Sequence, residues 1–209
     1  MRVPNAVHEA RAWRIGEITP DFILEDVWAL PAHGGAGDFQ TLLDLMATSD
    51  PVSSGSLPTR VLWRIRDLLG AAFRLGRIAG SADDGERAAK LPIPGTHETS
   101  LAERLPDELR GTAAGMRLGS LPFAPLYRTD DEFAAEISNQ TVHGVIHLGW
   151  ADQGGGRYQG QMAVYVKPRG RLGQGYMALI KPFRYAIVYP ALMRRIERTW
   201  DARASEKRK

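Results

Sequence analysis

The sequence predicts an α+β fold in which a long C-terminal helix covers an antiparallel sheet. Three observations support this prediction. Runs rich in Val, Ile, Tyr and Phe follow one another through the second half of the chain, as expected for a β-meander. Short polar or glycine-rich stretches separate these runs where hairpin turns belong. After the meander, apolar residues recur at helical spacing, which favours a helix packed on the sheet.

The start of the chain is expected to form one strand and two helices. Residues 10–15 alternate weakly between polar and apolar and favour a strand. Thr19 and Pro20 form the pattern of an N-cap followed by proline at the first helical position, which predicts a helix from 19 to 30. A second, shorter helix is predicted over residues 38–47 from its apolar stripe.

An arginine-rich amphipathic helix is predicted over residues 57–76, with apolar residues on one face. The cationic residues in and just after it are Arg60, Arg64, Arg66, Arg74 and Arg77. This pattern fits a core helix with a solvated back, or a helix that binds anionic lipid or an acidic partner. Residues 79–90 are expected to form a flexible loop, residues 91–95 an extended segment, and residues 101–111 short helical pieces.

The second half is predicted in more detail. Its four strands are expected over residues 123–129, 132–138, 141–151 and 157–167. Turns are expected at residues 139–140 and 153–156. The final helix is predicted over residues 172–200, with kinks at Pro182 and Pro190, because proline interrupts helical hydrogen bonding.

Composition narrows the class of protein. Hydrophobic residues make up 44% and charged residues 24% of 209 residues, which is typical of one soluble globular domain spanning 1–209. The net charge is +3, and the basic tail at 201–209 supplies two of these charges, so no basic face for nucleic acid is expected. The absence of cysteine excludes disulfides and thiolate chemistry.

The sequence shows neither a signal peptide nor a membrane-spanning helix. Residues 1–12 lack a signal-peptide pattern. Residues 176–193 contain two charges and two prolines, which is unfavourable for a spanning helix, so a cytoplasmic protein is expected.

Several stretches resemble a known family. They are residues 125–150, 154–170 and 176–200, together with SLPTRVLWRIRDLLG (56–70) and LPIPG (91–95). The family is an uncharacterised, largely actinobacterial domain-of-unknown-function family that is also found fused to short-chain-dehydrogenase-like domains. It is grouped with the START-like, polyketide cyclase-like (SRPBCC, helix-grip) superfamily. The resemblance implies a sheet curled around the C-terminal helix with a cavity between them, and it implies no catalytic residues. Because the glycines at 154–156 lie between two strands, NAD binding is not expected.

The hairpin at 132–151 places two histidines and two glutamates on one face. If Asn139-Gln140 is a two-residue turn, Glu136 lies opposite His143 and Glu132 lies opposite His147. Such pairs are consistent with ordinary cross-strand pairing, with a polar patch in a ligand cavity, or with a metal site made of N and O ligands only. No Gly-x-Ser-x-Gly elbow or triad partner accompanies them.

Aromatic residues of the predicted sheet and helix are candidates for the walls of a ligand cavity. They are Tyr127, Trp150, Tyr165, Tyr176 and Phe183. We therefore expect a protein that binds a small apolar or aromatic molecule, with no cofactor, metal, nucleic acid or stable membrane insertion. One alternative is an enzyme of cyclase, hydratase or hydrolase type that uses a His–Glu pair in the cavity. The other is a protein that binds a partner or membrane surface through residues 57–77. The ligand and the oligomeric state stay open.

Overall fold

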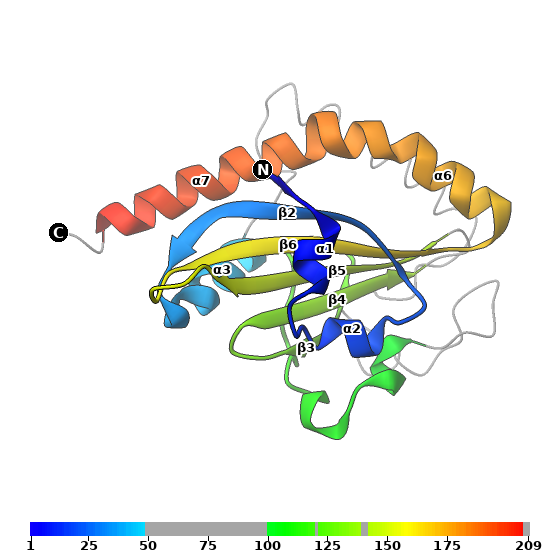
Figure 1. The fold of residues 1–209 in the computed structure, drawn as a ribbon, viewed down its shortest axis with the longest axis horizontal. Helices are drawn as coiled ribbons and strands as arrows, with labels where there is room; N and C mark the ends of the chain where they lie inside the picture. Colours follow the sequence, from blue (N-terminus) through cyan, green and yellow to red (C-terminus); the bar gives the residue numbers. More distant parts are fainter. Residues whose placement is uncertain (49–99, 120, 139–141, 207–209) are drawn as a thin grey trace.

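A six-stranded antiparallel sheet forms the centre of the computed structural model, which describes residues 1–48, 100–119, 121–138 and 142–206 (Figure 1). The strand order is β1-β2-β6-β5-β4-β3. The strands are β1 (Arg2–Val3), β2 (Ile23–Gly34), β3 (Ala124–Arg128), β4 (Glu132–Ser138), β5 (Val142–Asp152) and β6 (Tyr158–Pro168). The last four lie within a residue of the predicted strands, and the α+β prediction is confirmed.

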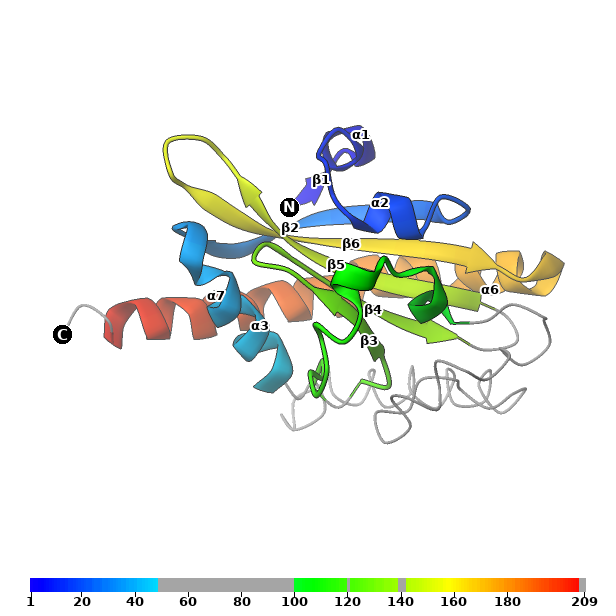
Figure 2. The ribbon, with the colours of Figure 1, turned by 90° about the horizontal axis from the view of Figure 1, so that it is seen from below.

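The C-terminal helix lies across one face of this sheet (Figure 2). It consists of α6 (Gly170–Phe183), a π-helical segment η5 (Arg184–Val188) and α7 (Tyr189–Glu206). The helix bends between α6 and α7, as predicted from Pro182 and Pro190 (Figure 1). At the bend, the Tyr189 N–H donates to the Arg184 carbonyl five residues earlier, which is the spacing of a π-turn.

The helix predicted from 19 to 30 is wrong, because Ile23–Gly34 is the strand β2. Thr19 ends a preceding helix rather than capping a new one, and its hydroxyl donates to the Ile15 carbonyl. From Val27 to Ala32, apolar residues point to both faces of the sheet, and both faces are covered. A strand buried on both sides has no simple alternation, so its apolar run resembles a helical stripe.

Short helices cover both faces of the sheet. The helix α3 (Phe39–Thr48), which confirms the one predicted over 38–47, follows the 3-10 turn η1 (Ala36–Asp38) and shares a core with α7. The opposite face carries α1 (Asn5–Glu9), α2 (Ile15–Ile18), η3 (Leu101–Arg104) and η4 (Asp107–Leu109) (Figure 2). No strand forms over 10–15, where the chain turns between α1 and α2. The predicted elements at 57–76, 79–90 and 91–95 lie outside the described residues.

Hydrophobic cores flank the sheet on both sides, and a smaller third cluster of Val142, Val166 and Met177 lies beneath α6 on the helix side. The core on the helix side contains Leu30, Phe39, Leu148, Trp150 and Ile196 among its buried members. The core on the other side includes Ile15, Val27, Leu101, Tyr127 and Val145. Within the described part of the chain, no helix has the length and apolar character needed to span a bilayer. The sheet is thus a central layer with a separately packed core on each side.

Candidate functional site

The two His–Glu pairs form on one face of the sheet, but in a register that differs from the predicted one. Ser138 pairs with His143, so a two-residue turn does not join β4 and β5. The register is shifted by two residues, which keeps the same side chains on the same face because the period of a strand is two. Each histidine then reaches its glutamate diagonally. The distances are 2.7 Å from His143 Nε2 to Glu136 Oε2 and 3.0 Å from His147 Nε2 to Glu132 Oε2.

Glu132 is buried and attaches the N-terminal segment to the sheet. Besides His147, its carboxylate accepts the main-chain N–H groups of Arg14 and Ile15 at the start of α2, at 2.9 and 3.4 Å. The Tyr127 hydroxyl donates to it at 2.8 Å. Burial opposes ionisation, but donation from His147, Arg14 and Tyr127 outweighs it and lowers the pKa of Glu132. Glu132 is therefore an ionised anchor for α2.

Glu136 plays the corresponding role for the segment that contains η3. The Ser100 hydroxyl donates to one carboxylate oxygen, and the Leu101 N–H donates to the other at 3.2 Å. Ser100 also caps η3 by accepting the Ala102 N–H. The ring of Phe22 covers His143, with the two ring centroids 4.9 Å apart. Each glutamate thus binds one covering segment through a main-chain N–H, and each is oriented by one histidine.

A third buried histidine, His8 in α1, joins this face to the N-terminal segment. Its ring nitrogens lie 3.2 Å from Gln161 Oε1 and 3.1 Å from the Tyr165 hydroxyl, both on β6. Its ring meets that of His147 edge-on at 5.3 Å. Burial, together with the charge of His147, lowers the pKa of His8 to about 4. His8 is therefore neutral at pH 7, as befits a buried imidazole with two neutral partners.

The chemistry open to this face follows from how far its carboxylates are engaged. A carboxylate has about four acceptor sites. Glu132 accepts four hydrogen bonds and Glu136 accepts three, so both are held mainly by the protein itself. Among the described residues, the Nδ1 atoms of His143 and His147 are buried without a partner. No group of three or more potential metal ligands occurs within that same part of the chain. The two carboxylates therefore cross-link the sheet to the segments that cover it.

The aromatic candidates are divided between the two faces. Tyr127 and Tyr165 lie on the His–Glu face, where burial raises the pKa of both hydroxyls. Trp150 and Tyr176 lie on the helix side, in the cores beneath α7 and α6 respectively. Phe183 is 43% exposed. The structure therefore brings only Trp150 and Tyr176 into the layer between sheet and helix, and the His–Glu pairs lie across the sheet from both.

Sequence reasoning missed a buried polar cluster between β2 and the π-helical segment. The Asp26 carboxylate is fully buried and lies 2.8 Å from the Arg184 guanidinium. Its other oxygen accepts the Tyr189 hydroxyl at 3.0 Å and the Trp28 indole N–H at 3.2 Å. Arg184 also donates to the Tyr189 hydroxyl at 2.9 Å through Nε. One signal was available, since a carboxylate within the apolar run ILEDVWAL is unusual for a buried strand.

The layer between sheet and helix is packed unevenly. Beneath α7, the side chains of Leu148, Trp150 and Ile196 are at most 1% exposed. Beneath α6 and η5, by contrast, Ile146 and Val164 on the sheet stay half-buried although they face the helix. On the helix, Tyr176, Ile180 and Val188 are half-buried as well. Within the described part of the chain, these apolar side chains thus face another layer and still keep part of their surface accessible.

Fold and site together define a class: an α+β protein with an open antiparallel sheet, a long C-terminal helix across one face and internally paired buried charges. Comparison with protein families then gives one match. Residues 18–191 match the family described as "Protein of unknown function (DUF2867)", and the chain belongs to this family. The expected membership of a domain-of-unknown-function family is thereby confirmed. No curated protein and no solved structure shows significant similarity to the chain.

Proposed function

We propose that this protein binds a small apolar or aromatic molecule between its sheet and the α6–η5 part of the C-terminal helix. The observation that carries the proposal is the half-burial of Val164, which packs in one cluster with Tyr176 and Ile180. Ile146, in the neighbouring cluster that includes Val188, is half-buried as well. Ligand sites are mostly apolar, with a few polar groups that orient the ligand. Burial raises the pKa of Tyr176 to about 12, so its hydroxyl stays protonated.

The neighbouring polar cluster supports the same location. Asp26, Arg184 and Tyr189 lie at the point where β2 and the helix are both irregular. β-Bulges and π-helical segments are both frequent beside binding sites. We also propose that the fold is of the helix-grip, START-like type, a class in which the space between sheet and helix holds the ligand. An antiparallel sheet crossed by a long C-terminal helix supports this assignment.

Native mass spectrometry of gently purified protein tests the proposal directly. We expect a stoichiometric extra mass that is lost on denaturation and that identifies the ligand class. If the protein carries no ligand, titration with the neutral fluorophore N-phenyl-1-naphthylamine is expected to saturate at one equivalent. A bare protein mass together with the absence of saturable fluorophore binding would overturn the proposal.

Two matched variants locate the binding. Val164→Trp fills the half-buried region and is expected to weaken fluorophore binding about tenfold or more. Leu179→Trp adds the same ring at a residue of α6 that is 58% exposed, and is expected to bind as the unmodified protein does. A folded Val164→Trp protein with unchanged affinity would contradict the proposed location.

A further inference from the structure

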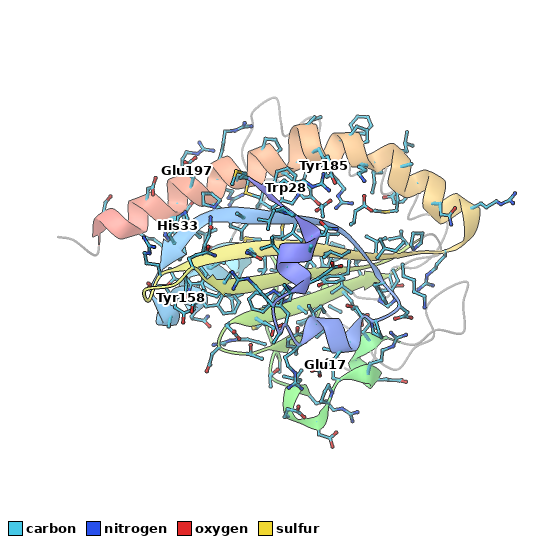
Figure 3. The ribbon with its side chains drawn as sticks, in the orientation of Figure 1. Glu17, Trp28, His33, Tyr158, Tyr185 and Glu197 are labelled. Carbon is cyan, nitrogen blue, oxygen red and sulfur yellow. The ribbon has the colours of Figure 1, made fainter. Side chains whose placement is uncertain are left out.

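A separate pocket opens at the end of the sheet away from α6, where Figure 3 labels His33 on β2 and Tyr158 on β6. Its volume is about 580 Å³, within the range of sites for small organic ligands. It is lined by His33, Gly34, Gly35, Gln153, Gly156, Arg157, Tyr158 and Gln159. None of the residues considered above for the ligand site between sheet and helix belongs to this lining, so this is a second location.

The walls of this pocket are fixed by the fold. Between Ala29 and His33, β2 has two more residues than the facing part of β6, so the strand bends as it approaches the pocket. The indole N–H of Trp150 donates to the Gly35 carbonyl at 2.8 Å, and that of Trp200 donates to the His33 carbonyl at 3.1 Å. Both tryptophans belong to the helix-side core, so the main chain along one wall is held in place.

The charges of the lining are of one sign. Arg157 and His33 are exposed, and in the described part of the chain neither side chain has an ion pair or hydrogen bond. The lining contains no carboxylate. Two carboxylates lie near the lining without belonging to it, and each is oriented by a main-chain N–H: Asp38 accepts the Gly35 N–H and Asp152 accepts the Gly154 N–H, at 2.9 and 2.7 Å. A concave surface with an unpaired guanidinium and an imidazole favours an anionic ligand.

The lining also contains an aromatic ring and two side-chain amides. Tyr158 is half-buried beside the turn of the β5–β6 hairpin. The side-chain amides of Gln153 and Gln159 donate to main-chain carbonyls, so their positions are fixed. We propose that this pocket binds a small organic anion whose phosphate or carboxylate group contacts Arg157 and His33 and whose ring or apolar body lies against Tyr158. Its volume exceeds that of an inorganic ion, which is why an organic anion fits best.

The test is a calorimetric titration with phenyl phosphate, with ¹H–¹⁵N NMR spectra to locate the binding. Phenyl phosphate is expected to bind more tightly than inorganic phosphate and to shift the amide signals of Gly34, Gly35 and Gly156. Arg157→Gln is expected to weaken binding about tenfold or more, since one lost charged contact is worth about 1.4 kcal/mol. Arg171→Gln removes the same charge from an exposed residue of α6 and is expected to bind as the unmodified protein does.

Further measurements distinguish a carboxylate ligand from a phosphate ligand, and binding at this pocket from binding between sheet and helix. Tighter binding of benzoate than of phenyl phosphate would support a carboxylate ligand, and the reverse order would support a phosphate ligand. The Val164→Trp protein is expected to bind phenyl phosphate normally, so failure at one site is distinguishable from failure at the other. Equal affinity of the Arg157→Gln protein, or amide shifts confined to residues away from the pocket, would overturn the proposal.

Discussion

The Asp26 carboxylate lies 2.8 Å from the Arg184 guanidinium, although the two residues are 158 positions apart in the chain. Asp26 follows a register shift in β2, and Arg184 begins the π-helical segment, so the ion pair joins the irregular points of both elements. Burial disfavours the charge on Arg184, but Tyr189 and Asp26 raise its pKa above the ordinary value. The Arg184 guanidinium therefore keeps its charge in the interior.

Removing one partner of this pair leaves a buried charge unpaired. We expect Arg184→Met to lower the free energy of unfolding by about 3–5 kcal/mol, because Asp26 then loses its counter-ion. Lys181→Met is the matched control on the same helix. Lys181 pairs with Glu25 at 2.8 Å but is 45% exposed, so a cost below about 1 kcal/mol is expected. Urea denaturation of both variants measures the difference, and equal costs would contradict the role assigned to Asp26.

Replacing the anchor of α2 should loosen the N-terminal segment. Glu132→Gln exchanges one acceptor oxygen for a donor that faces other donors, and we expect a cost of about 2–3 kcal/mol. Hydrogen exchange of the Arg14 and Ile15 amides should accelerate. Glu108→Gln is the control, because Glu108 pairs with the same arginine through an exposed contact. Unchanged exchange at Arg14 in the Glu132→Gln protein would show that the carboxylate does not hold α2.

Lowering the pH should destabilise the protein, because His8 binds a proton less readily in the folded state than in the unfolded state. A free histidine takes up a proton near pH 6.5, whereas His8 in the folded protein does so only at about 4. Between these values the unfolded state binds more protons, so lowering the pH favours unfolding, by on the order of 3 kcal/mol in all. The His8→Gln protein should lack this component. Asn5→Ala, which removes a hydrogen bond of the same helix to the Leu24 carbonyl, should destabilise equally at every pH. Unfolding curves from pH 7 to pH 4 make the comparison.

Two glycine-to-alanine substitutions should change the stability of the protein in opposite directions. At Gly149, a Cβ would lie 3.0 Å from the Trp13 ring and 3.2 Å from His147 Cε1, so we expect a loss of about 1–3 kcal/mol. At Gly175 in α6, apart from the adjoining residues and helix backbone, no atom lies within 4 Å of the added Cβ, and we expect a gain of up to about 1 kcal/mol from helix propensity. Thermal unfolding reports both. A neutral Gly149→Ala substitution would mean that Trp13 does not pack closely on β5.

The hairpin shows how far a local pattern can predict a site. The register of β4 and β5 is shifted by two residues from the predicted one, yet Glu136 and Glu132 still contact the expected histidines. A shift of two residues preserves the face of every side chain, whereas a shift of one would have separated the pairs. The other partners of these glutamates could not be predicted. No local sequence pattern indicates that the main-chain N–H of Leu101 or Arg14 donates to a particular glutamate.

The strand β2 shows the corresponding failure. Its apolar residues are buried on both faces because α7 covers one face and the segment of α1 and α2 covers the other, so the alternation that marks a strand is lost. For the same reason the buried role of Asp26 was not predicted, because its partner Arg184 lies 158 residues further along the chain. The pocket near His33 was likewise not predicted, since its lining combines two segments more than a hundred residues apart.

The sequence by itself determined the β-meander, the long C-terminal helix with its proline-associated bend, and the shared face of two histidines and two glutamates. These features follow from side-chain periodicity and from proline, which act within a few residues. Only the tertiary structure decided that the His–Glu face is covered by the N-terminal segment rather than by the helix. It alone also decided that Asp26 meets Arg184. The physical reason is that the cover of each sheet face and the pairing of buried charges depend on packing between distant segments, which local periodicity does not encode.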